Sequence, residues 1–317
     1  MNHKFLLTTL ICGITFSMGQ SQTTNGNVIT DLHQTANTKF IEVDGISYAY
    51  REFGKKSGIP VVLLQHFTGT MDNWDPAITN GLAEYFPVVL FDNKGIGASA
   101  GQTPTTIEAM AKDAVSFIKG LGFKKVNLLG FSMGGFISQR IVFDEPMLIN
   151  KLMLVGTGPK GGEGIAEITK PLTASASMDP DDQKLYLFYE SSSTSRALGK
   201  ESLKRINRRL VNRDPDASLP AIQAQLQSIL QWAESDSTAL NQLKKINHPV
   251  LVINGSDDIV VPTINSYVLF QHLPNSKLSL YPDSGHGSLF QFPELFLTEA
   301  ISFLQAGIVD SQNIRKQ

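Results

Sequence analysis

The sequence predicts an α/β fold with a mostly parallel central sheet, helices on both faces of the sheet, and an inserted helical cap. Three observations carry this prediction. Short apolar runs typical of buried parallel strands alternate with segments of helical periodicity over the first half of the chain. From residue 157 to about residue 246 the pattern is helical and lacks strand-like runs, over a length too great for an ordinary loop. Strand–helix alternation then resumes at residue 249.

The order of the elements divides the 317 residues into a core that is interrupted once. Asp44-Gly45, between two alternating runs, predicts a β-hairpin. The expected strands cover residues 40–43, 46–53, 61–64, 87–91, 126–131, 151–156, 249–253 and 277–280. The expected helices cover residues 74–85, 107–118, a segment after residue 132, then 181–189, 200–210 and 219–232 in the cap, and finally 262–272 and 293–304. We therefore expect a first part of the core over residues 39–156, a cap over 157–246 and a second part of the core over 247–306.

The N-terminus is typical of an export signal. Asn2-His3-Lys4 is a short positive stretch, and the apolar segment 5–16 is shorter than the roughly 20 residues of a transmembrane helix. We expect a signal peptide over residues 1–21, a flexible leader over 22–38 and a frayed tail over 307–317, with export to the periplasm or the medium. An uncleaved anchor is the alternative. The only cysteine, Cys12, lies in the signal, so the mature chain would have neither a disulfide nor a thiol nucleophile.

A glycine-bracketed serine follows the apolar run 126–131. Gly130, Ser132 and Gly134 form G-x-S-x-G, and a helical pattern continues behind them. A strand that enters a helix through such a turn is a nucleophile elbow, in which strained backbone geometry projects the serine Oγ above the sheet. The pattern alone is weak, because a plain βα turn has the same composition. It predicts Ser132 as a nucleophile only if an acid and a histidine lie at the same edge.

Two later strands supply these groups. Asp258 and its neighbour Asp257 follow the strand 249–253, although either is also an ordinary turn residue. His286 lies between two glycines behind the strand 277–280, where it has room to reach across a site. Sites in parallel sheets lie at the carboxyl ends of the strands. The order serine, acid, histidine at such ends predicts nucleophilic catalysis by Ser132 with His286 as the base.

With these motifs the chain resembles the capped serine hydrolases of the α/β-hydrolase superfamily over residues 40–305. This group includes esterases, haloperoxidase-like perhydrolases, C–C bond hydrolases and prolyl iminopeptidases. The resemblance implies the α/β-hydrolase fold. The family pattern G-x-x-D-x-x-x-P matches residues 255–262 and selects Asp258 as the acid. The pattern D-x-R-G-x-G-x-S matches residues 92–99 with Lys94 in place of Arg, and we interpret it as a structural turn that borders the site.

The family's H-G-x oxyanion motif aligns with Gln65-His66-Phe67, so Gln65 replaces the usual His and His66 replaces the usual Gly. The resemblance implies that the backbone N–H groups of Phe67 and Met133 form the oxyanion hole. Backbone donors do not depend on side-chain identity, so the hole is compatible with both replacements.

The predicted function is that of an exported serine hydrolase that acts through an acyl-enzyme, with small carboxylic esters as its first expected substrates. Amide cleavage of the prolyl iminopeptidase type is an alternative, for which cap acids such as Glu163 and Glu190 could bind an amino terminus. A non-catalytic protein that binds a small ligand is another. Lys and Arg (27) nearly balance Asp and Glu (29), and no basic run in the sequence argues for a nucleic-acid partner. We expect a small molecule as the partner, no cofactor, no metal, and no stable membrane association after signal cleavage.

Overall fold

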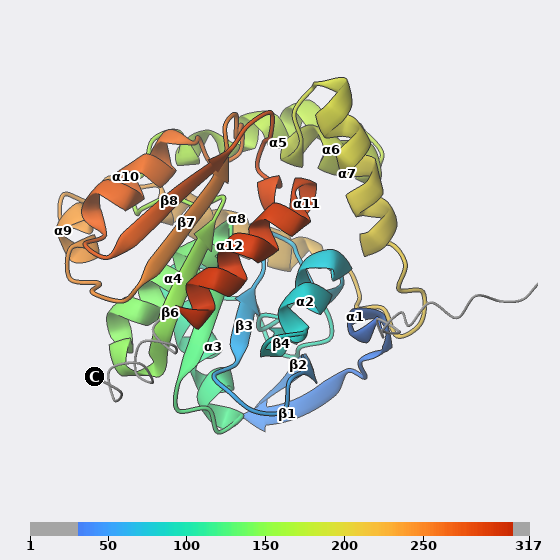
Figure 1. Cartoon of the computed structure of the whole chain (residues 1–317), viewed down its shortest axis with the longest axis vertical. Helices are drawn as coiled ribbons and strands as arrows, with labels where there is room; N and C mark the ends of the chain where they lie inside the picture. Colours follow the sequence, from blue (N-terminus) through green and yellow to red (C-terminus); the bar gives the residue numbers. More distant parts are fainter. Residues whose placement is uncertain (1–30, 307–317) are drawn as a thin grey trace, which may run out of the picture. The chain divides into compact units, whose positions relative to one another are not determined.

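The computed structural model describes residues 31–306. In this part of the chain eight strands form one sheet in the order β1-β2-β4-β3-β5-β6-β7-β8 (Figure 1). The pairs β1–β2 and β2–β4 are antiparallel, and all other neighbours in the sheet are parallel. The strands are β1 Lys39–Val43, β2 Ile46–Gly54, β3 Val61–Leu64, β4 Pro87–Phe91, β5 Val126–Phe131, β6 Ile149–Val155, β7 Val250–Gly255 and β8 Ser276–Tyr281.

Local chemistry explains the first hairpin and the buried strands. Asp44 and Gly45 both have positive φ, 51° and 74°, which is the backbone of the tight turn that twists with its strands. Every residue of β3, β4, β5 and β7 is buried, and apart from Asn127 and Asn254 these strands are apolar runs rather than alternating ones. Successive residues of β3 face opposite sides, with Val62 and Leu64 in one apolar core and Val61 and Leu63 in the other.

Helices cover both faces of the sheet. One core is shared with α3 Ile107–Gly120, α4 Met133–Asp144 and α10 Ile264–His272. The other is shared with α2 Pro76–Ala83, α11 Ser288–Gln291 and α12 Pro293–Gln305. A short 3₁₀ helix, Met71–Asn73, precedes α2, and another, Pro146–Leu148, follows α4. The predicted fold class is therefore confirmed.

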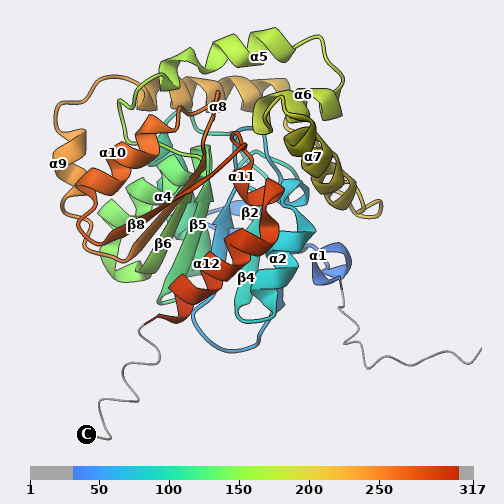
Figure 2. The same cartoon turned by 45° about the horizontal axis from the view of Figure 1, so that its top comes forward.

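The segment between β6 and β7, all of it among the described residues, consists of helices joined by loops and contains no strand. It contains the 3₁₀ turn Ile165–Ile168, α5 Thr169–Ser175, α6 Pro180–Phe188, α7 Ser193–Ile206, α8 Leu219–Trp232 and α9 Ala239–Leu243. In Figure 2, α5, α6 and α8 lie across the end of the sheet at which β5 runs into α4, and α7 runs down beside α11 and α2. The helix expected over residues 200–210 instead begins at Ser193, because Ser192 caps it by accepting the N–H of Ser195 at 3.0 Å. No helix within residues 31–306 is long and apolar enough to cross a membrane.

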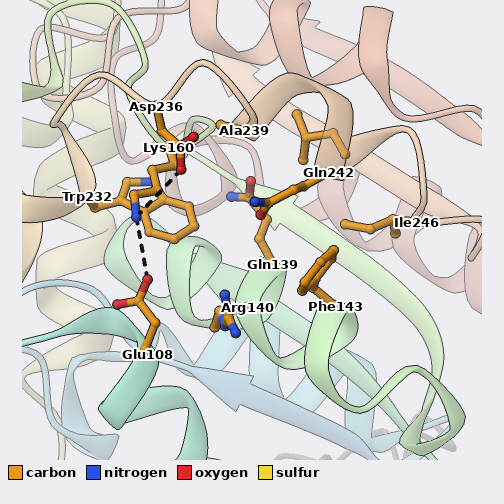
Figure 3. Close-up of a pocket in the computed structure, with 11 residues that line it drawn as sticks. Glu108, Gln139, Arg140, Phe143, Lys160, Trp232, Asp236, Ala239, Gln242 and Ile246 are labelled. Carbon is orange, nitrogen blue, oxygen red and sulfur yellow. Dashed lines mark ion pairs between the residues drawn. The ribbon is translucent and has the colours of Figure 1, made fainter.

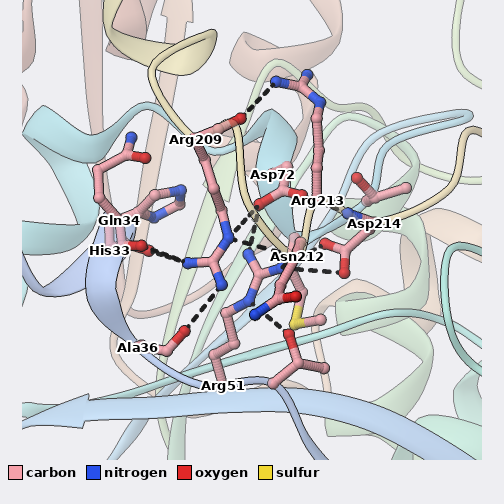
Figure 4. Close-up of polar contacts among 12 residues, drawn as sticks. His33, Gln34, Ala36, Arg51, Asp72, Arg209, Asn212, Arg213 and Asp214 are labelled. Carbon is pink, nitrogen blue, oxygen red and sulfur yellow. Dashed lines mark hydrogen bonds and ion pairs between the residues drawn. The ribbon is translucent and has the colours of Figure 1, made fainter.

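Residues 31–38 correct the prediction of a flexible leader up to residue 38. They contain α1, Leu32–Thr35, and pack against the cap through Arg209, whose guanidinium donates to the carbonyls of His33, Gln34 and Ala36 at 2.8–2.9 Å (Figure 4). A buried cationic side chain needs such acceptors, and this polar segment supplies them. The expected signal peptide, the leader before residue 31 and the tail 307–317 lie outside the described residues.

The same polar cluster joins cap and core. Arg51 of β2 contacts Asp72 and lies 3.0 Å from the carboxylate of Asp214, which belongs to the loop between α7 and α8. Asp72 in turn accepts the backbone N–H of Asp214. These side chains are buried, and each charge is paired, as burial of charge requires (Figure 4).

Candidate functional site

Ser132 occupies a strained turn between β5 and α4. Its backbone has φ 56° and ψ −121°, a conformation that costs a non-glycine residue about 1–3 kcal/mol. The neighbouring glycines make the turn possible. A Cβ at Gly130 would lie 2.5 Å from the carbonyl oxygen of Gly134, and one at Gly134 would lie 2.1 Å from that of Leu64. The strand and helix therefore approach as closely as an elbow requires, with Ser132 at its apex.

His286 and Asp258 form a buried pair. His286 Nδ1 lies 2.7 Å from Asp258 Oδ2, and both side chains are about 1% exposed or less. The other carboxylate oxygen, Oδ1, accepts the backbone N–H groups of Val260 and Val261 at 2.8 and 2.9 Å. Asp257 is exposed instead. Of the two adjacent acids, the one that contacts the histidine is Asp258, which the family pattern selects.

Ser132 lies beside this pair at the ends of β5 and β6. Its backbone N–H donates to the carbonyl of Val155 at 2.9 Å. The next residue, Gly156, faces the histidine, because a Cβ there would lie 3.2 Å from His286 Nδ1. The rings of Phe131 and His286 have centroids 5.0 Å apart. In the described part of the chain the ring of His286 hydrogen-bonds to Asp258 and not to Ser132 Oγ.

The loop after β3 is held by Gln65. Its side-chain nitrogen donates to the carbonyl of Thr70 at 3.1 Å, and its side-chain oxygen accepts the backbone N–H of His66 at 2.9 Å. One glutamine thus bridges both ends of the loop, which gives a physical role to the residue that replaces the family's histidine. The start of the loop packs on the elbow, since a Cβ at Gly134 would also lie 2.9 Å from the carbonyl of Gln65.

The two candidate oxyanion donors lie on adjoining pieces of backbone. Phe67 is in this loop, and Met133 is the first residue of α4. Within residues 31–306 neither backbone N–H has a hydrogen-bond acceptor. The first N–H groups of a helix lack partners inside the helix and carry its positive dipole end, so Met133 is suited to hold a negative oxygen.

Phe188, at the end of cap helix α6, is a site residue that the sequence did not reveal. Its carbonyl accepts the N–H of Gly287 at 2.8 Å, and its ring centroid lies 5.5 Å from that of His286. Ser132 is only 5% exposed and His286 only 1%. The single sequence signal was its position at the end of an expected cap helix, which does not distinguish it from other apolar cap residues.

The motif over residues 92–99 is a structural turn. Asp92 accepts the backbone N–H groups of Met71 and Ala98 at 2.8 and 3.0 Å, and Ser99 Oγ donates to the Asp92 carbonyl at 2.7 Å. Burial raises the pKa of Asp92 to about 6. Lys94, which replaces the usual Arg, pairs with Asp113 of α3 at 3.5 Å.

A separate cavity of about 70 Å³ lies behind α4, between α3 and the end of the cap. Lys160 spans it, 3.6 Å from Glu108 and 3.8 Å from Asp236, with Trp232 alongside (Figure 3). Ser132, Asp258 and His286 do not line it. In residues 31–306 no group of three or more His, Cys, Asp or Glu side chains is arranged to hold a metal ion.

The chain matches the model of the alpha/beta hydrolase fold family over residues 59–293. It therefore belongs to the alpha/beta hydrolase family. A solved alpha/beta hydrolase fold protein from Chitinophaga pinensis is 44% identical, with a TM-score of 0.84, and the match covers 86% of this chain and 99% of that one.

Relatives with assigned reactions are more distant. The 2-hydroxy-6-oxo-6-(2'-aminophenyl)hexa-2,4-dienoic acid hydrolase of Metapseudomonas resinovorans is 26% identical over 84% of this chain and 90% of its own. A bromoperoxidase-like protein of Mycobacterium tuberculosis, BpoC, is 28% identical over 81% of this chain and 97% of its own. The first of these relatives is named a hydrolase and the second a bromoperoxidase, so their names assign different reactions.

Proposed function

We propose that this protein is a serine hydrolase that uses Ser132, His286 and Asp258 as a catalytic triad, most readily on small carboxylic esters. The observation that supports it best is the 2.7 Å contact between His286 Nδ1 and Asp258 Oδ2, beside a serine in strained backbone geometry. A buried carboxylate on Nδ1 keeps the proton there and leaves Nε2 free to take the serine proton. The family and its hydrolase members are consistent with this chemistry.

In this mechanism Ser132 Oγ attacks the acyl carbonyl while His286 Nε2 takes its proton. The backbone N–H groups of Phe67 and Met133 stabilise the oxyanion, each by roughly a hundred- to a thousandfold in rate. The tetrahedral intermediate collapses, the leaving alcohol takes the proton from His286, and an acyl-enzyme remains. Water then attacks the acyl carbon and gives its proton to His286. The second tetrahedral intermediate collapses, the bond to Ser132 Oγ breaks, Oγ takes the proton back from His286, and the carboxylic acid leaves. The contact between Ser132 Oγ and His286 shortens in the substrate complex, as such contacts commonly do.

Substrate entry requires the cap to move, because Ser132 and His286 are almost fully covered. Phe188 is the residue of the cap that lies on His286, so we assign it to the part that moves. Such motion of a cap both admits the substrate and excludes water during the reaction.

The test compares Ser132→Ala with the wild type on 4-nitrophenyl esters of increasing acyl length. We expect the variant to lose turnover by at least about a thousandfold, since removal of one triad member leaves only the residual effect of the oxyanion hole and binding. Retention of wild-type activity in Ser132→Ala would refute the triad. A prolyl arylamide and a carbamate in the same panel separate ester cleavage from cleavage of an amide or of a carbamate.

We also propose export through the N-terminal signal over residues 1–21. The support is the positive start and short apolar segment of the sequence. N-terminal sequencing of protein recovered from the periplasm or medium tests it, and an intact Met1 on protein found only in the cytoplasm contradicts it.

A further inference from the structure

The loop that carries Phe67 also holds a second imidazole, that of His66, which the mechanism above does not use. Its ring centroid lies 5.5 Å from that of Phe131 and 5.3 Å from that of Phe188. The same two rings lie 5.0 and 5.5 Å from His286. The two imidazoles therefore share one pair of aromatic neighbours, which places His66 at the site rather than on a distant surface.

The tautomer of His66 follows from its polar contact. Nδ1 lies 2.7 Å from the carbonyl oxygen of Phe67, and a carbonyl oxygen can only accept. Nδ1 therefore carries the proton and Nε2 presents a lone pair. Burial lowers the pKa of His66 to about 3, against the smaller opposing effect of the bond to Phe67, so the ring is neutral at ordinary pH.

The lone pair on His66 Nε2 accepts no hydrogen bond within residues 31–306. In the described part of the chain the ring hydrogen-bonds only through Nδ1, and His66 remains partly accessible. An acceptor among aromatic rings loses its water when the site closes over a substrate, and that loss is unfavourable unless a donor replaces the water.

We propose that His66 is a specificity-determining residue whose Nε2 accepts a hydrogen bond from the acyl part of the substrate, and that preferred substrates carry a neutral O–H or N–H donor on the first or second atom from the carbonyl carbon. The inference rests on the proposed function. His66 directly precedes Phe67, whose backbone N–H is the proposed donor to the carbonyl oxygen of the substrate. The ring of His66 is therefore attached to the backbone one residue before this donor. A 2-hydroxyacyl ester has this chemistry, and so does a carbamate with an N–H.

The first experiment compares ethyl 2-hydroxybutanoate with ethyl 2-methylbutanoate, which differ by a hydroxyl in place of a methyl. The ratio of their kcat/KM values is measured by pH-stat for the wild type, His66→Phe and His66→Gln. Any effect of a substitution that is the same for both esters cancels in this ratio. The ratio for His66→Phe gives the effect of the hydroxyl on ester reactivity in the absence of the imidazole, and is the reference for the wild type.

We expect the wild-type ratio to exceed that of His66→Phe by about 10- to 100-fold, since an unpaired buried acceptor penalises the methyl ester. His66→Gln, which keeps an acceptor, should give an intermediate ratio. Equal ratios in the wild type and His66→Phe would overturn the role of His66 but leave the ester hydrolase intact. Failure of the wild type to hydrolyse either ester contradicts the proposed function itself.

A second measurement does not depend on folding of His66 variants. The ¹⁵N resonances of His66 are recorded in the Ser132→Ala protein with ethyl 2-hydroxybutanoate or ethyl 2-methylbutanoate, and methyl N-methylcarbamate serves as the N–H probe. We expect an unprotonated Nε2 in the free protein and a shift of Nε2 with the hydroxy ester or the carbamate but not with the methyl ester. A protonated Nε2, or the same shift with all three compounds, contradicts the inference.

Discussion

Replacement of Asp258 by Asn is expected to reverse the tautomer of His286. Asp258 Oδ1 accepts two backbone N–H groups, from Val260 and Val261, at 2.8 and 2.9 Å. In Asp258→Asn the side-chain oxygen stays with these donors, because an NH₂ group there would face two N–H groups. The NH₂ group then takes the place of Oδ2, 2.7 Å from His286 Nδ1.

An NH₂ group facing Nδ1 requires Nδ1 to accept, so the proton moves to Nε2 and the imidazole no longer takes the proton of Ser132. The loss expected for a wrong tautomer with intact geometry is about 10⁴-fold in kcat. Hydrolysis of a 4-nitrophenyl ester at saturating substrate measures it. Asp257→Asn is the matched control, because Asp257 is the exposed neighbour, and it should stay within about twofold of the wild type. Retention of a tenth or more of the wild-type kcat in Asp258→Asn would refute the assigned geometry.

Three further predictions concern stability. Gly134→Ala should lower the free energy of unfolding in urea by about 3 kcal/mol or more, because its new Cβ would lie 2.1 Å from the carbonyl oxygen of Leu64. The control Gly122→Ala, at φ 83° in open space, should lower it by only about 1–2 kcal/mol. Equal effects of the two substitutions would contradict the close contact at Gly134. Arg209→Ala removes the donors to three carbonyls of residues 33–36 and should lower the free energy of unfolding by about 3 kcal/mol. Substitution of its exposed neighbour, Arg208→Ala, should lower it by less than about 0.5 kcal/mol. An Arg209→Ala variant as stable as the wild type would show that these residues do not hold the cap. Burial lowers the pKa of His33 from 6.5 to about 4, so the unfolded chain binds an extra proton between these pH values. Up to about 3 kcal/mol of the free energy of unfolding is therefore lost as the pH falls from 6.5 to 4. His33→Gln should remove this pH dependence, and the same loss of stability in His33→Gln would contradict the prediction.

The parts of the fold that sequence predicted are those governed by local patterns. The strand Val61–Leu64 is an apolar run because both faces of the sheet are covered, and the pattern over Ile107–Gly120 is helical because one side packs on the sheet. The hairpin at Asp44-Gly45 is a matter of backbone sterics. Each of these features depends on a few consecutive residues.

The features that sequence did not predict depend on partners far along the chain. The acceptors in residues 31–38 are used by Arg209, more than 170 residues later, so a polar segment that resembles a flexible leader is part of the folded domain. In the sequence, Gln65 is only a departure from the family motif, and its role becomes clear from its hydrogen bonds to Thr70 and His66. Phe188 contacts His286 only because the cap folds over the sheet. The candidate residues Ser132, Asp258 and His286 could be found because each follows a strand that the sequence predicts.

The most direct test of the central proposal is identification of the residue modified by a fluorophosphonate. Intact-mass analysis should give one adduct per chain, and peptide sequencing should locate it on Ser132, with no adduct in Ser132→Ala. Modification should be slow in Asp258→Asn, because it too needs His286 to take the serine proton. An adduct on another residue, or equal labelling of Ser132→Ala, would contradict the assignment of Ser132 as the nucleophile.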